Sequence, residues 1–180
     1  MIVNKGILYW ITGLSGSGKT TISKDFYQKI KNKNPNTIFL DGDLLREVLD
    51  LKHAGYDNES RYNIAMQYAR LAKLFTDQGI NVIFATISMF EQVRAWNRSN
   101  IEKYVEIYIK MTLKEIFARD KNQLFSKALN KEEKNVVGVD ISFEEPKNPD
   151  IVLHNNSEVS INKLSKDLIK KVKLLKLNIL

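Results

Sequence analysis

Short apolar runs alternate along this chain with longer segments in which apolar residues recur every three or four positions. Runs rich in β-branched and aromatic residues predict strands at 6–12, 37–40, 81–87, 104–109 and 151–153. Helical spacing predicts helices at 18–33, 44–51, 59–78, 90–100 and 113–120, and an amphipathic C-terminal helix that carries Ile161 to Leu175. This alternation is typical of a mostly parallel sheet with helices on both faces. The pattern therefore predicts an α/β fold with a five-stranded sheet.

One segment, residues 121–148, breaks the alternation. It is polar, rich in Lys, Glu and Asn, and has only weak periodicity. The chain has 180 residues, which suits one domain, and it contains no repeat and no linker that would separate domains. We predict a single domain spanning 1–180 with a mobile lid at about 121–148. A disordered surface loop is the alternative for that segment.

The composition excludes several classes of protein. The chain has no cysteine, so a disulfide scaffold, a thiolate nucleophile and a cysteine-ligated zinc site are ruled out. No apolar run approaches the roughly 20 residues that cross a bilayer, and the first apolar run is too short for a signal peptide. We expect a cytoplasmic protein that has no membrane partner.

Basic residues exceed acidic ones, 28 Lys and Arg against 21 Asp and Glu, for a net charge of +7. One interpretation is a compositional bias in which lysines simply solvate the surface. The other is a positive field that gathers anionic ligands such as nucleotides. A nucleic-acid partner would require a basic stripe interleaved with aromatic residues, and the sequence has none, so we expect nucleotide substrates and no nucleic acid.

A phosphate-binding loop lies between the first predicted strand and the first predicted helix. Residues 13–20 match G-x-x-x-x-G-K-[ST] in full, and this context is the one the motif requires. Its backbone N–H groups and the following helix N-terminus are suited to a polyphosphate. Lys19 would reach the β- and γ-phosphates, and the Thr20 hydroxyl would hold Mg²⁺. The predicted ATP-binding residues are Gly13, Leu14, Ser15, Gly16, Ser17, Gly18, Lys19, Thr20 and Thr21.

A second polar cluster, Asp41-Gly42-Asp43 followed by Arg46, lies at the end of the second predicted strand. Strand ends at the carboxyl edge of an open α/β sheet border the ligand crevice. Two carboxylates beside a magnesium nucleotide can orient the metal and accept a proton from an attacking hydroxyl. Arg46 can bind an anionic acceptor. The alternative is that Asp43 only caps a helix and Arg46 is a surface arginine. A complete phosphate loop in the same chain makes that alternative less favoured.

These motifs, in this order, resemble the adenylylsulfate (APS) kinase family. The likeness runs from about residue 8 to 153. It rests on the segments 10–22, Leu40 to Asp43 with Arg46, Gly55-Tyr56, Arg61 with Asn63-Ile64, Val82 to Ser88, Arg94 and Arg98, Arg119-Asp120, Gly138 with Asp140, and Phe143 to Pro146. The resemblance implies a P-loop kinase fold.

Members of this family use ATP to phosphorylate the ribose 3′-hydroxyl of a nucleoside 5′-phosphosulfate. The resemblance implies that Asp43 activates that hydroxyl, with Lys19 as the other catalytic residue, and that Asp41 lies near the Mg²⁺ held by Thr20. It implies that Arg119 packs on ATP. The implied acceptor-binding residues are Asp43, Arg46, Tyr56, Arg61, Asn63, Ile87, Ser88 and Val136. It also implies a homodimer, which is usual among family members.

The departures from the family pattern lie on the acceptor side. Met89 stands where the family has proline, and Glu91 where it has arginine. The lid phenylalanine that would face the acceptor base is Val136, so the double aromatic sandwich for adenine would lose one wall, leaving Tyr56. A stacked base contributes ~1–3 kcal/mol. The chain thus resembles the cytidine diphosphoramidate kinase branch of bacterial capsule phosphoramidate synthesis, whose acceptor is the pyrimidine nucleotide cytidine 5′-diphosphoramidate.

Three other functions stay open. The first is a true APS kinase that makes 3′-phosphoadenylylsulfate. The second is a non-catalytic nucleotide-binding module, although such a module has no need of Asp43 and Arg46. The third is a P-loop kinase for a sugar or a nucleoside monophosphate, which the family order of the motifs disfavours.

Overall fold

The computed structural model describes residues 4–120, 123–156 and 158–176 of the chain. Lys121 and Asn122, at the start of the predicted lid, and the two ends of the predicted 1–180 domain lie outside the described residues. Five parallel strands form one sheet in the order β2-β3-β1-β4-β5. The strands are β1 (Leu8–Thr12), β2 (Thr37–Asp41), β3 (Asn81–Ala85), β4 (Tyr104–Lys110) and β5 (Ile151–His154). The predicted α/β fold is confirmed.

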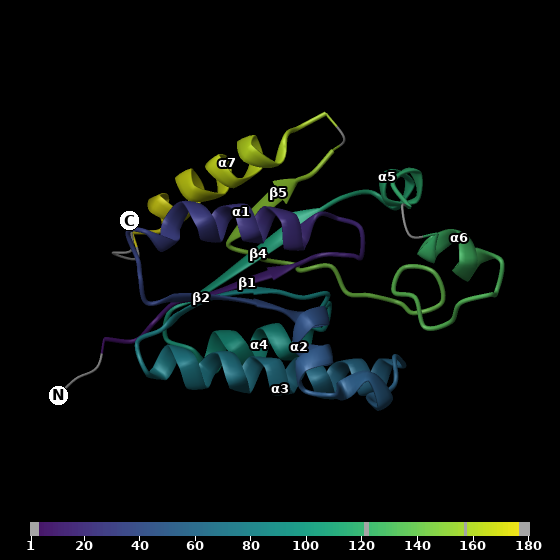
Figure 1. Ribbon diagram of the computed structural model, residues 1–180, viewed down its shortest axis with the longest axis horizontal. Helices are drawn as coiled ribbons and strands as arrows, with labels where there is room; N and C mark the ends of the chain where they lie inside the picture. The colour runs from purple at the N-terminus through teal and green to yellow at the C-terminus, as the bar shows by residue number, and fades with distance from the viewer. Residues whose placement is uncertain (1–3, 121–122, 157, 177–180) are drawn as a thin grey trace.

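The helices cover both faces of the sheet (Figure 1). Helices α1 and α7 lie on one face, and α3 and α4 lie on the other. The helices are α1 (Lys19–Lys31), α2 (Gly42–Val48), α3 (Asn58–Asp77), α4 (Glu91–Asn100), α5 (Leu113–Ala118), α6 (Leu124–Leu129) and α7 (Ile161–Leu174), with a 3₁₀ turn at Leu51–Ala54. The predicted helices are present, each with bounds shifted by a few residues.

Strand β1 lies in the centre of the sheet, and this position explains why its sequence is apolar without alternation. Tyr9 and Ile11 pack toward α1 and α7, while Leu8 and Trp10 pack toward α3 and α4. These four side chains are fully buried, because a parallel strand covered by helices has no wet face. Strand β1 thus anchors the phosphate loop that follows it between two packed layers.

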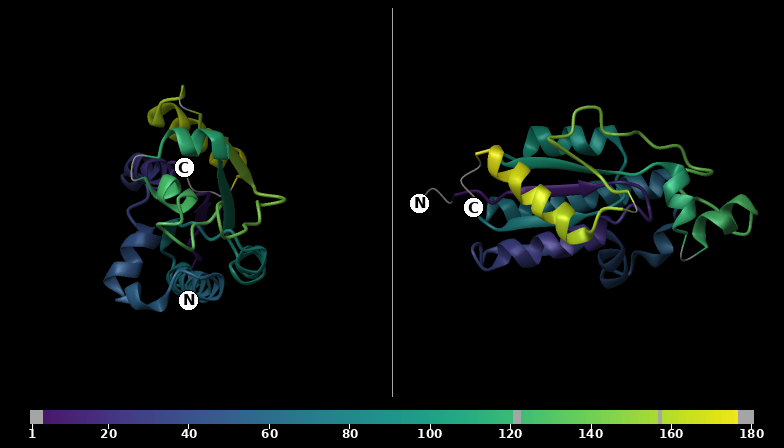
Figure 2. Two further views of the ribbon diagram at one scale, coloured as in Figure 1. Left: turned by 90° about the vertical axis from the view of Figure 1, so that its right-hand side faces the viewer. Right: turned by 90° about the horizontal axis from the view of Figure 1, so that it is seen from above.

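The segment predicted to be a lid contains more regular structure than its sequence suggests. The 121–148 segment contains helix α6, which weak periodicity did not predict, and the lid projects beyond the carboxyl ends of the strands (Figure 2). Phe125 and Val136 of the lid are buried in an apolar cluster with Leu14 and Ile116. The cluster combines residues from several segments, and α6 itself contributes only Phe125 and Ala128 as buried residues, too few to show a clear helical period in the sequence.

None of the described helices combines the length and the apolar character needed to cross a membrane.

Candidate active site

The phosphate loop adopts backbone conformations that require glycine. Gly18, at the start of α1, has φ +89°, and a Cβ there would lie 2.5 Å from Asn155 Nδ2. A Cβ on Gly13 would lie 2.6 Å from the Ile109 carbonyl oxygen. Because no side chain caps α1, its first N–H groups stay available for an anion. The loop is therefore built for close approach of a phosphate.

The Lys19 ammonium lies inside this loop. Its Nζ donates a 2.8 Å hydrogen bond to the Leu14 carbonyl oxygen, and the residue is buried. Burial lowers the pKa of Lys19 to about 8, while the charges of Asp43 and Asp41 act in the opposite direction. A phosphate group at this position would favour the charged form of the lysine.

Thr20 and Asp41 meet beside the loop. Thr20 Oγ1 donates a 2.7 Å hydrogen bond to Asp41 Oδ2. Asp41 Oδ1 accepts from the backbone N–H groups of Asp43 (3.1 Å) and Leu44 (3.3 Å), so this carboxylate also caps α2. A hydroxyl and a carboxylate are the oxygen donors that Mg²⁺ takes in nucleotide sites. The predicted metal residues thus lie together and fit the ion.

Across the part of the chain that the structure describes, no group of three or more His, Asp and Glu side chains could hold a metal.

Arg46 and Tyr56 form one side of the acceptor corner. Arg46 is 8% exposed, its Nη2 donates a 2.7 Å hydrogen bond to the Gly55 carbonyl oxygen, and its guanidinium lies 4.0 Å from the Tyr56 ring centroid. Its Nη1 is buried with no partner among the described residues. Asp43 is exposed to the same space. A free guanidinium donor beside an exposed carboxylate suits an anionic acceptor that also carries a hydroxyl.

Arg61 links this corner to the lid. Its Nε donates a 2.7 Å hydrogen bond to the Tyr56 carbonyl oxygen, and its Nη2 donates a 2.8 Å bond to the Asn135 carbonyl oxygen. Burial and, second, the nearby Arg46 charge lower the pKa of Arg61, which stays cationic. The guanidinium groups of Arg46 and Arg61 both lie within 5.3 Å of the Tyr56 ring centroid.

These groups open into one cavity of about 750 Å³, a volume suited to small-molecule ligands. Its walls include the phosphate loop, the acceptor corner, the loop after β3 and the lid. The lining holds fourteen predicted site residues, namely Ser15, Gly16, Gly18, Lys19, Thr20, Thr21, Asp41, Asp43, Arg46, Tyr56, Arg61, Ile87, Ser88 and Arg119.

The structure places the other predicted residues away from the cavity wall. Gly13, Leu14 and Ser17 are buried in or behind the phosphate loop, and Asn63 is exposed on α3. Val136 is 4% exposed within the apolar cluster of the lid, and its neighbour Val137 lines the cavity. Contacts of Asn63 and Val136 with an acceptor stay predictions.

Asn155 is a cavity residue that the sequence reasoning missed. Its Nδ2 donates a 2.7 Å hydrogen bond to the Ser17 carbonyl oxygen, which supports the phosphate loop. Its Oδ1 is buried and has no partner among the described residues. The available signal was its position directly after β5, at the same sheet edge as the phosphate loop. Met89, Phe90, Ser142 and Phe143 also line the cavity and were not predicted.

Comparisons with known proteins agree with this geometry. The family model for adenylylsulphate kinase matches residues 5–154. The chain is 45% identical over 171 residues to cytidine diphosphoramidate kinase of Campylobacter jejuni, covering 95% of this chain and 99% of that protein. It is 38% identical over 157 residues to adenylyl-sulfate kinase of Clostridium kluyveri, covering 87% and 78%.

Solved structures show the same relationship. The Mycobacterium tuberculosis APS kinase in complex with AMPPNP and APS superposes with a TM-score of 0.84 at 28% identity, covering 94% of this chain and 98% of that one. A gluconokinase from Sinorhizobium meliloti shares the fold alone, with a TM-score of 0.64 at 12% identity. The fold and the phosphate loop define a P-loop kinase, an ATP-dependent phosphotransferase. Within that class, the chain belongs to the adenylylsulphate kinase family.

Proposed function

We propose that this enzyme transfers the γ-phosphoryl group of ATP to the ribose 3′-hydroxyl of a nucleotide, and that cytidine 5′-diphosphoramidate is its favoured acceptor. The observation that supports the proposal most is the shared cavity. It brings the phosphate-loop residues Lys19 and Thr20 into one space with Asp43 and with the acceptor corner of Arg46 and Arg61.

In the proposed reaction, the 3′-hydroxyl oxygen of the acceptor forms a bond to the γ-phosphorus, and the Asp43 carboxylate accepts the proton of that hydroxyl. The bond between that phosphorus and the bridging oxygen breaks, and ADP leaves. Lys19 offsets the charge on the transferring group, and Arg46 and Arg61 hold the 5′ anionic groups of the acceptor. Mg²⁺, held by Thr20 with Asp41 beside it, would neutralise phosphate charge when bound.

The choice of base rests on the relatives. Tyr56 is 47% exposed and offers a ring for stacking. Phe90 and Phe143 also line the cavity, so the number of aromatic walls does not select cytosine over adenine. The 45% identity with cytidine diphosphoramidate kinase over nearly the whole of both chains supports the pyrimidine acceptor.

A competition assay tests this choice. Equal concentrations of cytidine 5′-diphosphoramidate and APS are offered with MgATP, and the products are separated to see which acceptor gains a 3′-phosphate. Asp43→Ala serves as the blank. We expect the cytidine product to dominate. If APS wins by tenfold or more, equal to about 1.4 kcal/mol of transition-state discrimination, the enzyme is an APS kinase.

True APS kinase activity is the second candidate, and the match to the adenylylsulphate kinase model together with the 38% identical relative favours it.

The proposal also includes a homodimer, which analytical ultracentrifugation of the purified chain would test.

A further inference from the structure

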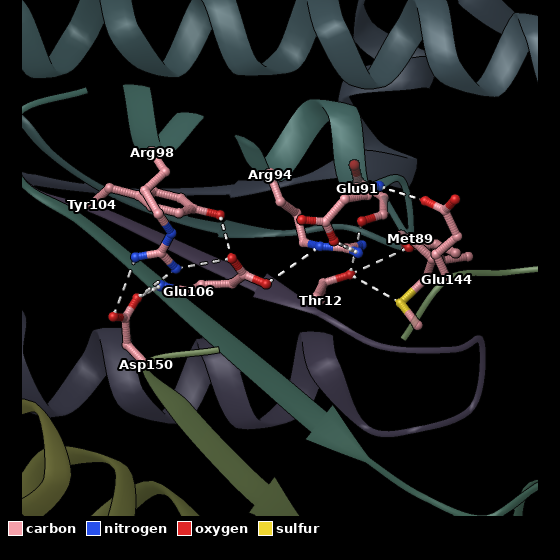
Figure 3. Close-up of polar contacts among 11 residues, drawn as sticks. Thr12, Met89, Glu91, Arg94, Arg98, Tyr104, Glu106, Glu144 and Asp150 are labelled. Atoms are coloured by element: carbon pink, nitrogen blue, oxygen red, sulfur yellow. Dashed lines mark hydrogen bonds and ion pairs between the residues drawn. The ribbon is translucent and has the colours of Figure 1, made fainter. Parts of the chain in front are cut away.

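Helix α4 begins without a cap of its own. Its N-cap residue is Phe90, which has no polar side chain, and no local side chain accepts from the first turn. Glu144, from the segment where the lid returns to the sheet, supplies the missing acceptor. Its Oε2 accepts a 2.7 Å hydrogen bond from the Glu91 backbone N–H, across 53 residues of sequence (Figure 3). A carboxylate at a helix N-terminus is favoured by the orphan N–H groups and by the helix dipole.

Glu144 also makes a second contact on the other side of Phe90. Its backbone N–H donates a 3.2 Å hydrogen bond to the Met89 carbonyl oxygen. Residues 86–90, here called the acceptor loop, all line the cavity, and Ile87 and Ser88 are predicted acceptor contacts. One residue of the 121–148 segment therefore contacts the acceptor loop through its backbone and, through its side chain, the first residue of α4 directly after that loop.

Thr12, the last residue of β1, also contacts the acceptor loop. Its Oγ1 lies 3.3 Å from the Ile87 carbonyl oxygen, 3.2 Å from the Ser88 carbonyl oxygen and 3.4 Å from Met89 Sδ (Figure 3). Thr12 directly precedes the phosphate loop. The acceptor loop is thus held between the strand that carries the phosphate loop and the arm that returns from the lid.

We propose that Glu144 is a positioning residue for the acceptor. This inference rests on the proposed function and adds to it a residue that lies outside the cavity lining given above. The lid's return arm, residues 141–145, contributes Ile141, Ser142 and Phe143 to the cavity wall. Glu144 fastens this arm to the acceptor loop, so the wall beside the acceptor keeps one shape. The phosphate loop has its own support from β1 and Asn155, so its shape does not depend on Glu144.

The chain offers a matched control in the next residue. Glu145 is also a carboxylate of the return arm, but its Oε2 pairs with Lys110 Nζ at 2.9 Å, and both side chains are more than two-fifths exposed. Within the described part of the chain, no hydrogen bond or ion pair joins Glu145 to the acceptor loop. Glu145→Ala therefore removes a carboxylate from the same arm while leaving the α4 cap in place.

The experiment measures steady-state kinetics for Glu144→Ala, Glu144→Gln and Glu145→Ala, varying ATP and the acceptor separately. The acceptor is whichever of cytidine 5′-diphosphoramidate and APS the wild-type enzyme phosphorylates. For Glu144→Ala we expect the acceptor KM to rise about tenfold or more, since a charge-assisted hydrogen bond is lost. The KM for ATP should stay within about twofold, and Glu145→Ala should leave both values within about twofold. Glu144→Gln keeps an oxygen that can accept from Glu91 N–H and should lie between.

Several results would overturn the inference. They are an unchanged acceptor KM in folded Glu144→Ala, an equal rise in both KM values, or an equal effect of Glu145→Ala. Circular dichroism melts establish folding at the assay temperature. If Glu144→Ala is unfolded there, Glu144→Gln carries the test, and an unchanged acceptor KM in that variant rejects the role. If the wild-type enzyme phosphorylates neither acceptor, the proposed function is rejected, and the inference with it. If the wild type is active and the variants behave as just described, only the role of Glu144 is rejected.

Discussion

Thr20 Oγ1 lies 2.7 Å from Asp41 Oδ2, joining the first turn of α1 to the end of β2. Both residues lie at the carboxyl ends of the strands: Thr20 follows β1 and the phosphate loop, and Asp41 ends β2. In the sheet, β3 lies between these two strands. This contact brings a hydroxyl and a carboxylate to the point where a magnesium ion would lie beside the phosphates.

Asp41 has two tasks that one pair of variants separates. Asn is as good an N-cap as Asp, so Asp41→Asn should leave the free energy of unfolding nearly unchanged. It removes the charge, so the Mg²⁺ concentration for half-maximal rate should rise about 10- to 100-fold. Asp41→Ala should show the same magnesium defect and also lose ~1 kcal/mol of stability. Magnesium titrations and urea unfolding measure the two effects, and an unchanged magnesium requirement in Asp41→Asn would exclude the metal role.

Asp43 and Lys19 should differ in which kinetic constant they change. Asp43 is exposed, so Asp43→Ala should fold normally. Removing a general base should lower kcat by ~10²–10⁴-fold with little change in the KM for ATP. Lys19→Ala should lower kcat and also weaken ATP binding. Steady-state kinetics with varied ATP give both values, and near-normal turnover in Asp43→Ala would refute its role as base.

ATP affinity should depend on pH through Lys19. Burial lowers the pKa of free Lys19 to about 8, and bound phosphate raises it, because phosphate stabilises the charged ammonium. ATP binding should therefore be at full strength below pH 8. Above it, binding must take up a proton, so affinity should fall by up to about tenfold per pH unit. Isothermal titration calorimetry from pH 7 to 9, in two buffers with different ionisation enthalpies, measures affinity and proton uptake.

Lys19→Arg is the control for this profile, since a guanidinium stays charged throughout that range. Its affinity, whatever its absolute value, should be flat between pH 7 and 9. A wild-type profile as flat as that of Lys19→Arg would contradict the lowered pKa.

We predict that the lid moves. Residues 123–148 should exchange amide hydrogens faster without ligand than with a non-hydrolysable ATP analogue and acceptor, because closure excludes the water that competes for the phosphoryl group. Hydrogen exchange followed by mass spectrometry measures this, with the buried strand β1 as the internal reference. Equally slow exchange in the lid with and without nucleotides would reject the prediction.

The two arginines of α4 should contribute unequally to stability. Arg94 is 2% exposed and pairs with Glu91 (2.7 Å) and the buried Glu106 (3.4 Å), whereas Arg98 is 47% exposed and pairs with Glu106 and Asp150 (Figure 3). Arg94→Met leaves Glu106 without its buried partner and should cost ~3–5 kcal/mol. Arg98→Met should cost ~0–1 kcal/mol. Urea unfolding curves give both values, and equal losses would contradict the role of burial.

The elements of the sheet could be predicted from sequence because their signals are local. Leu8 to Ile11 is apolar at every position, which marks a strand buried on both faces. The phosphate loop could be predicted because its glycines and Lys19 lie within eight residues, a spacing that the backbone geometry itself demands. Helix α6 could not, because it is a six-residue helix whose two buried side chains, Phe125 and Ala128, pack in a cluster with residues from other parts of the chain.

The sequence by itself determined the chemistry of the phosphate loop and the family, since both depend on residue types at short, ordered spacings. Only the tertiary structure decided that Thr20 meets Asp41, that Asn155 supports Ser17, that Val137 rather than Val136 lines the cavity, and that Glu144 caps α4. The physical reason is that these contacts join elements distant in sequence. Sheet order and the path of the lid set them, and no local period or spacing encodes either.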